Sequence, residues 1–166
     1  MGSRTREAAD ACRLKVPESA VIRGAIERDL EEIARIEVES FADAWSVADF
    51  RTLMQNPHAI FLVAENEATQ GVAGYVVMLC VLDESEVLNI AVDPARRGAA
   101  LGGRLLDAGV AEAESRGSRI TFLDVRESNA AAKKLYESRG FEEISRRRKY
   151  YRSPVEDALI LRRAMK

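Results

Sequence analysis

Hydrophobic residues follow two different spacings along the chain, and each spacing predicts one kind of element. Apolar positions recur three or four residues apart in segments 28–41, 47–55, 101–116 and 129–138, as expected of helices. Continuous or alternating apolar runs, typical of strands, fill segments 20–22, 60–64, 72–78, 86–92, 120–125, 142–149 and 157–164. The pattern therefore predicts an α+β domain in which helices sandwich a sheet.

The phase of each helical segment predicts which of its side chains reach the core. The expected core face of the first helix carries Leu30, Ile33, Ala34 and Phe41. The expected stripe of the helix over 101–116 is Leu105, Leu106, Gly109, Val110 and Ala113. In the last helix Leu135 and Ala131 form the expected stripe, which leaves Tyr136 on an adjacent face.

Length and composition suit one ordinary domain. The chain has 166 residues, of which 47% are hydrophobic and 31% are charged. Residues 1–18 are polar and lack clear periodicity. We therefore expect a flexible N-terminal extension followed by a single domain over residues 19–166.

The charge balance argues against several partners. Lys and Arg number 25 against 27 for Asp and Glu, a net charge of −2 that gives no overall attraction to nucleic acid or to an anionic membrane. No apolar run approaches the roughly 20 residues that span a bilayer, and charged residues interrupt the first twenty positions, unlike a signal-peptide core. We expect a cytoplasmic protein with no membrane partner and no direct nucleic-acid binding.

Histidine and cysteine usage argues against several reaction classes. His58 is the only histidine, whereas the HExxH zinc helix needs two, and the Ser-His-Asp triad and the Cys-His pair each need a histidine in a defined relation to its partners. We therefore expect none of these sites. The two cysteines, Cys12 and Cys80, are too few for a disulfide framework and are not spaced as a metal pair. We expect no metal, His58 on a surface loop, and Cys80 in the core.

Two segments carry the candidate chemistry. Residues 89–106 place a turn of small residues between a strand and the start of a helix, where unpaired backbone N–H groups and small side chains suit a diphosphate. Tight packing of a strand on a helix is the alternative interpretation. In the second segment Asp124 lies inside a strand, which disfavours acids, and Tyr136 lies on the helix that follows. A structural ion pair and an ordinary packed tyrosine are the alternatives there.

The sequences LNIAVDP at residues 88–94 and LDVRESNAAAKKLYESRGF at residues 123–141 resemble a known family. They are similar to the GCN5-related N-acetyltransferase (GNAT) superfamily, and most closely to its ribosomal protein alanine N-acetyltransferase members of the RimI type. The resemblance covers about residues 19 to 166. It implies transfer of an acetyl group from acetyl-CoA to an amine. It also implies the GNAT fold, a mixed, mostly antiparallel sheet of about seven strands whose fourth and fifth strands splay to admit the cofactor.

The resemblance also implies which residues contact the cofactor. Ile90, Ala91 and Val92 would line the acetyl-pantetheine through backbone groups, and one of their N–H groups would polarise the thioester carbonyl. Asn129 would hydrogen-bond the pantetheine arm. The diphosphate would be held by Arg97, Gly98, Ala99, Ala100, Leu101, Gly102 and Gly103.

The implied catalytic residues are Asp124, where the family places a general base, and Tyr136, where it places the acid. An ammonium must lose a proton before it attacks, and a phenol of pKa ~10 can protonate or hydrogen-bond the departing thiolate. We expect direct attack in a ternary complex. Asp124 is one methylene shorter than the Glu of the family, so its carboxylate lies roughly 1.5 Å further back. A water would restore its reach, and Glu127 is a fallback base.

A second departure from the family concerns the phosphate turn, where Ala100 replaces an expected glycine. If this position takes positive φ, alanine costs about 1 kcal/mol or more there.

The implied acceptor is a protein N-terminus, the N-terminal alanine of a small-subunit ribosomal protein. Trp45, Tyr150 and Tyr151 would line its groove, with ordinary packing as the alternative for Trp45. The basic run 146–149 is interpreted as a solvated strand edge, with contacts to ribosomal RNA or to the CoA 3′-phosphate as alternatives. Two other functions stay open: acetylation of a small amine, and a catalytically silent CoA-binding module.

Overall fold

The computed structural model describes residues 19–165, so the expected N-terminal extension and Cys12 lie outside the described residues. The strands are β1 Ala20–Gly24, β2 Ala59–Asn66, β3 Val72–Val81, β4 Glu84–Val92, β5 Ile120–Arg126, β6 Glu142–Arg152 and β7 Val155–Ala164. The helices are α1 Leu30–Ser40, α2 Val47–Met54, α3 Leu101–Ser115 and α4 Ala130–Glu137. Short 3₁₀ turns occupy Glu27–Asp29 and Pro94–Arg96.

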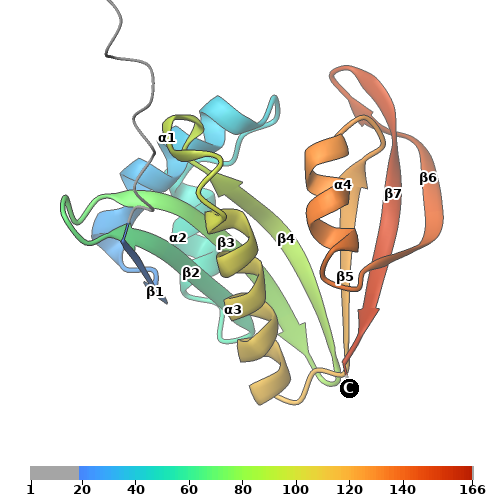
Figure 1. Cartoon of the computed structure of the whole chain (residues 1–166), viewed down its shortest axis with the longest axis horizontal. Coiled ribbons are helices and arrows are strands. Elements are labelled where there is room, and N and C mark those ends of the chain that lie inside the picture. Colours follow the sequence, from blue (N-terminus) through green and yellow to red (C-terminus); the bar gives the residue numbers. More distant parts are fainter. Residues whose placement is uncertain (1–18, 166) are drawn as a thin grey trace, which may run out of the picture.

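The strands form one seven-stranded sheet in the order β1-β2-β3-β4-β5-β7-β6. All neighbours are antiparallel except β4 and β5, which are parallel. This parallel pairing is short: residues 84–87 pair with residues 120–123, and β4 then continues to Val92 while the two strands diverge (Figure 1). The result is a sheet that is open between its fourth and fifth strands.

Helices cover both faces of the sheet, with α3 and α4 on one side and α1 and α2 on the other (Figure 1). One core cluster joins α3 and α4 to the sheet through residues such as Leu105, Leu123 and Tyr136. A second cluster joins α1 and α2 to the opposite face through residues such as Ile33 and Phe50. The predicted α+β sandwich with a mixed, mostly antiparallel sheet is confirmed.

Several local predictions are confirmed as well. The whole predicted stripe of α3 is buried, because its residues repeat with the helical period on the side that faces the sheet. Cys80 is buried in the core, and His58 is exposed in the turn before β2.

Two predicted core positions are wrong. Phe41 is exposed because α1 ends at Ser40 and Phe41 has an extended backbone, with φ −133° and ψ 141°, that turns its side chain away from the helical face. In α4 Ala131 is exposed, whereas Leu135 is half-buried and packs against the core cluster. Tyr136, expected on an adjacent face, is buried against Phe141, with ring centroids 5.9 Å apart. The core side of this short helix therefore includes Tyr136 as well as Leu135.

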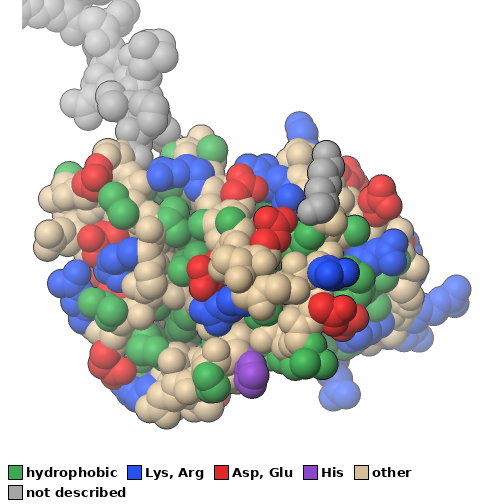
Figure 2. All heavy atoms as spheres, turned by 90° about the horizontal axis from the view of Figure 1, so that it is seen from below, with side chains coloured by type: hydrophobic (Ala, Val, Ile, Leu, Met, Phe, Trp, Pro, Cys, Tyr) green, Lys and Arg blue, Asp and Glu red, His purple; other side chains and the backbone are tan. Residues whose placement is uncertain are grey.

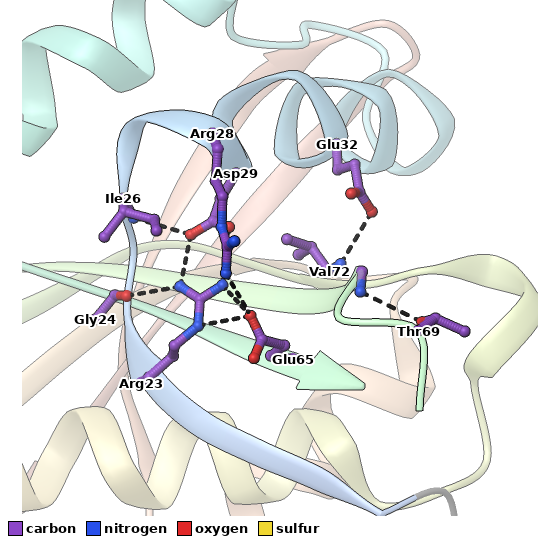
Figure 3. A network of polar contacts seen from close by, with 10 residues as sticks. Arg23, Gly24, Ile26, Arg28, Asp29, Glu32, Glu65, Thr69 and Val72 are labelled. Carbon is purple, nitrogen blue, oxygen red and sulfur yellow. Dashed lines mark hydrogen bonds and ion pairs between the residues drawn. The ribbon is translucent and has the colours of Figure 1, made fainter. Parts of the chain in front are cut away.

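A polar network fixes the start of α1 to the sheet (Figure 3). Arg23 of β1 donates to Asp29 Oδ2 at 2.7 Å and, through Nε, to Glu65 Oε2 of β2 at 2.8 Å. Asp29, which is almost fully buried, also accepts from the Ile26 backbone N–H at 2.8 Å. Further along the helix Glu32 accepts from the Val72 N–H at 2.9 Å. These contacts tie the start of α1 to β1, β2 and β3, the strands that lie on the side of β4 away from the gap.

Gly74 allows β3 to approach the end of β4 closely, opposite Val92 and beyond the point where β4 leaves β5. A Cβ at this position would lie 2.8 Å from the Ala91 carbonyl oxygen and 3.1 Å from Leu105 Cδ1. We expect Gly74→Ala to destabilise the protein by about 1–3 kcal/mol in urea unfolding, because a backbone oxygen cannot move aside. Gly24→Ala in β1 is the matched control, since a Cβ there meets nothing within 4 Å. Equal unfolding midpoints for the two variants would contradict this prediction.

Candidate functional site

The gap between β4 and β5 leaves one edge of β4 without a strand partner. Beyond Val87 no residue of β5 pairs with β4, whereas the other edge of β4 stays paired with β3 through Ile90, Ala91 and Val92. Backbone groups on an unpaired edge remain available to hydrogen-bond a ligand that lies along the strand. The three residues assigned to the acetyl-pantetheine therefore lie on the edge that an extended amide chain could use.

The first turn of α3 lies beside the end of β4. Ala100 is the N-cap residue and its side chain makes no capping hydrogen bond, so the first N–H groups of the helix have no side-chain cap. A Cβ on Gly102 would lie 3.7 Å from Leu135 of α4 and 3.7 Å from Val92 of β4. The structure thus brings together the turn predicted to bind the diphosphate, the end of β4, and α4. An uncapped helix N-terminus lined by small residues fits a diphosphate.

Gly103 gives room to a neighbouring arginine. A Cβ added there would clash with Arg139 Nη2, and Arg139 Nε pairs with Asp107 Oδ1 at 2.9 Å. The guanidinium at the end of α4 therefore rests on the first turns of α3.

The loop between β4 and α3 is anchored to α1. Asp93 accepts from the Ala95 N–H at 2.9 Å and from Arg35 Nη2 of α1 at 2.7 Å. Arg97 donates through Nε to the Val92 carbonyl at 3.3 Å and through Nη2 to Ser40 Oγ at 3.3 Å. The side chain of Arg97 thus points toward α1, and its backbone forms part of the turn before α3.

Two residues of this turn have positive φ. Gly98 has φ +88°, and Ala100 has φ 59° and ψ 16°, in the left-handed region. Glycine adopts this region freely, whereas alanine is strained there. Ala100, which stands where the family has glycine, therefore adopts the strained positive-φ conformation.

Asp124 lies on the face of β5 opposite the α3 and α4 helices. Its neighbours Leu123 and Val125 are buried in the cluster under these helices, so the alternation of the strand turns Asp124 toward the other face. The carboxylate is 20% exposed and pairs with Arg147 Nη1 of β6 at 3.2 Å. Glu127, the fallback base, is occupied by Arg146, whose Nη1 lies 2.7 Å from its carboxylate.

Tyr136 lies on α4, on the other face of the sheet. Burial raises the pKa of its phenol to about 12, with a smaller contribution from Tyr151, and no hydrogen bond contributes to the shift. The phenol is therefore protonated at neutral pH, as an acid must be. Because Asp124 and Tyr136 face opposite sides, only the open gap between β4 and β5 allows both to reach one reacting centre. Asn129 caps the same helix, since its Oδ1 accepts from the Ala132 N–H at 3.1 Å.

The predicted acceptor residues come from two separate elements. Trp45, in the loop between α1 and α2, is half-buried and packs on Phe50 at 5.6 Å between centroids. Tyr150 and Tyr151 of β6 form an edge-to-face pair at 5.2 Å. The Arg126 guanidinium lies 4.1 Å from the ring centroid of Tyr151. Partial burial and then the charge of Asp124 raise the pKa of Tyr151, so this phenol lies close to the candidate base.

Two glutamates at the site were missed by the sequence analysis. Partial desolvation and the charge of Asp124 raise the pKa of Glu86, whereas Arg147 opposes the shift. Strand alternation places Glu86 of β4 on the same face of the sheet as Asp124 of β5, and this alternation was the signal in the sequence. Glu37 is fully buried at a position where α1 faces the core, and it contacts both the Trp45 loop and β4. For Glu37 the signal was an acidic residue at a position where the helical spacing of α1 predicts an apolar one.

The surface carries mixed charge. Figure 2 shows a face on which acidic and basic side chains are interspersed with hydrophobic ones, without one continuous basic patch. Within residues 19–165 no group of three or more His, Cys, Asp and Glu side chains could hold a metal ion. In the same part of the chain, no helix is long and apolar enough to cross a bilayer.

A comparison with protein families shows to which family this chain belongs. The family model described as "Acetyltransferase (GNAT) family" matches residues 30–141. The chain belongs to this acetyltransferase family. The match spans α1, the open edge of β4, the turn before α3, and α4, so every candidate catalytic and cofactor-binding residue lies within it.

Individual members of the GNAT family are similar over most of the chain. The [ribosomal protein bS18]-alanine N-acetyltransferase of Escherichia coli (strain K12) is 38% identical over 135 residues, which cover 80% of this chain and 89% of that protein. The enzyme of the same name from Haemophilus ducreyi is 32% identical over 144 residues, covering 85% and 97%. The crystal structure of the ribosomal-protein-S18-alanine N-acetyltransferase from E. coli superposes with a TM-score of 0.81 at 35% identity, covering 89% of this chain and 95% of that one.

The strained residue Ala100 gives a prediction about stability. Ala100→Gly should raise the free energy of unfolding by up to about 1 kcal/mol, because relief of the left-handed strain exceeds the added entropy of the unfolded chain. Gly98→Ala, the matched opposite change, should lower it although a Cβ there meets nothing within 4 Å. Urea unfolding of both variants measures the difference. A lower midpoint for Ala100→Gly than for the unmodified protein would refute the strain at this residue.

Proposed function

We propose that this protein transfers the acetyl group of acetyl-CoA to the N-terminal α-amine of a protein, the N-terminal alanine of a small-subunit ribosomal protein. The observation that carries the proposal is the open gap between β4 and β5, with a carboxylate on one face and a protonated phenol on the other. The relatives named for acetylation of ribosomal protein bS18 support the choice of acceptor. A ribosomal acceptor would place the enzyme in the cytoplasm.

Acetyl-CoA supplies a thioester that an amine can attack. Backbone groups of Ile90, Ala91 and Val92 on the free edge of β4 would hold its acetyl-pantetheine portion, and one N–H would polarise the carbonyl. The side-chain oxygen of Asn129 caps α4, and its side-chain NH₂ group would donate to the pantetheine arm. The uncapped start of α3 would bind the diphosphate through Gly98, Ala99, Ala100, Leu101, Gly102 and Gly103, with Arg97 fixing the turn.

On the acceptor face, Asp124 would take the proton from the incoming ammonium, directly or through one water. Its partner in the structure is the Arg147 guanidinium, so the cationic acceptor would compete with Arg147 for the carboxylate. On the opposite face Tyr136 would donate its proton to the departing thiolate. The two proton transfers need only the side chains of Asp124 and Tyr136 at the gap. The amine would attack the thioester carbonyl directly, in a ternary complex.

The acceptor would bind between Trp45 and the two tyrosines of β6. Aromatic side chains provide apolar walls for an extended peptide, and their polar edges can hydrogen-bond its backbone. Turnover of a small amine with no turnover of an alanine peptide would instead favour the second open function. Binding of acetyl-CoA without transfer to any amine would identify a silent module.

The catalytic roles predict distinct losses of acetyl-CoA turnover on a peptide with a free N-terminal alanine. Asp124→Ala should reduce kcat/KM on the order of a hundredfold or more, because the base is removed. Asp124→Glu should retain activity, since it restores the longer side chain of the family. Asp83→Ala, in the exposed turn before β4, is the control and should leave turnover unchanged. Full activity of Asp124→Ala would remove this residue from the mechanism.

The phenol of Tyr136 gives a separate prediction. Tyr136→Phe should reduce kcat about tenfold to a hundredfold, because the thiolate loses its proton donor. With a pKa of about 12 the phenol stays protonated over the working range, so the ratio of wild-type to variant kcat should be constant with pH. Rates measured from about pH 7 to about pH 10 test this independence. A ratio that collapses toward one within that range would show that the group titrates lower and acts differently.

A further inference from the structure

Glu37 is a fully buried carboxylate that the proposed reaction does not use. It lies near the end of α1, and its partners come from three other segments. The Trp45 backbone N–H donates to Oε1 at 3.1 Å, and Asn89 Nδ2 lies 2.9 Å from Oε1 and 3.1 Å from Oε2. The Tyr75 hydroxyl of β3 donates to Oε2. One carboxylate thus links α1, β3, β4 and the loop that follows α1.

This arrangement is costly for a purely structural contact. Burial raises the pKa of Glu37, and the hydrogen bonds from Tyr75, Trp45 and Asn89 only partly oppose the shift. The hydrogen-bond donors to Glu37 among the described residues are all neutral groups. Apolar side chains usually fill such a position more favourably than a charged one.

One end of the cluster lies at the Trp45 wall of the proposed acceptor groove, and the other lies on the strand that would hold the acetyl group. Asn89 directly precedes Ile90 and stands where the pairing of β3 and β4 shifts register, between the pairs Val77 with Asn89 and Met78 with Val87. Such a bulge loses regular ladder contacts, so a side-chain anchor can fix its shape. Trp45 belongs to the loop that would form one wall of the acceptor groove. Glu37 therefore joins the wall to the strand that would hold the acetyl group.

We propose that Glu37 is a positioning residue whose carboxylate clamps the Trp45 loop to the bulge of β4 and so fixes the Trp45 wall of the acceptor groove. The inference rests on the proposed function for the identity of the groove. Loss of the clamp should weaken binding of the acceptor. It should spare acetyl-CoA, because Ile90, Ala91 and Val92 keep their pairing with β3.

The test compares single and paired substitutions. Glu37→Gln replaces the carboxylate by an amide, so that two amide groups face each other at Asn89. We expect the KM for the alanine peptide to rise about tenfold. The KM for acetyl-CoA should stay within about twofold. The double variant Glu37→Gln with Asn89→Asp reverses donor and acceptor, because the new amide can donate to the new carboxylate. It should recover most of the acceptor affinity. Asn89→Ala, which removes only the anchor on β4, should raise the acceptor KM even if Glu37→Gln does not fold.

Trp45 provides a readout that does not depend on turnover. It is the only tryptophan of the chain, so intrinsic fluorescence reports on this loop. Release of the clamp in Glu37→Gln or Asn89→Ala should shift the emission toward that of a more exposed indole, and the double variant should reverse the shift. Asp29→Asn removes a similarly buried carboxylate from the network at the start of α1 (Figure 3), so it should lower stability without changing either KM or the emission.

The outcomes separate the two proposals. Reduced stability in the Glu37 and Asn89 variants with an unchanged acceptor KM and unchanged emission would overturn the role of Glu37. Equal effects of Asp29→Asn and Glu37→Gln on the acceptor KM would also overturn it. If the unmodified protein does not acetylate the peptide, the proposed acceptor is wrong, and the fluorescence of the variants still decides whether Glu37 holds the loop.

Discussion

The early end of the parallel pairing between β4 and β5 determines the arrangement of the site. Because the two strands run in the same direction, both reach the wide end of the gap at their carboxyl ends. The helix that follows each strand therefore begins at that end, so the uncapped start of α3 and the Asn129 cap of α4 both lie near it. An antiparallel pair would have placed one of these helix starts at the opposite end of the sheet. The positions of the turn before α3, of the free edge of β4 and of the start of α4 thus follow from one strand direction.

The same gap explains how two candidate catalytic groups on opposite faces would serve one reaction. Strand alternation turns Asp124 away from the α3 and α4 side, while the chain reversal after β5 brings Tyr136 back onto that side. In a continuous sheet the backbone would separate them. In the proposed reaction the proton acceptor would then stand where the amine arrives, and the proton donor where the thiolate departs. This division requires no residue to change its role during the reaction.

The elements that repeat with a clear period could be predicted from the sequence, and those that depend on distant contacts could not. The α3 stripe and the alternation around Asp124 follow from burial of one face, so their phase is written in the sequence. The burial of Tyr136 in α4 involves Phe141, outside the helix, and was therefore not predicted. The strain at Ala100 could be stated only as a condition, because φ is fixed by the anchored loop around it. The Arg147 partner of Asp124 lies two strands away across β7, and no local pattern indicates it.

The charged groups around the groove fall into two kinds with different consequences for binding. The pair of Asp124 and Arg147 is partly solvated, with 52% of the arginine side chain exposed, and such pairs contribute about 0–1 kcal/mol. An incoming ammonium can therefore displace the guanidinium at small cost. Glu37, by contrast, is fully buried, and its hydrogen bonds cannot be replaced by water without opening α1 from the sheet. In the proposed reaction, the fixed carboxylate of Glu37 would shape the groove and the exchangeable carboxylate of Asp124 would receive the amine, which together allow a site to bind a cation precisely and still release the neutral product.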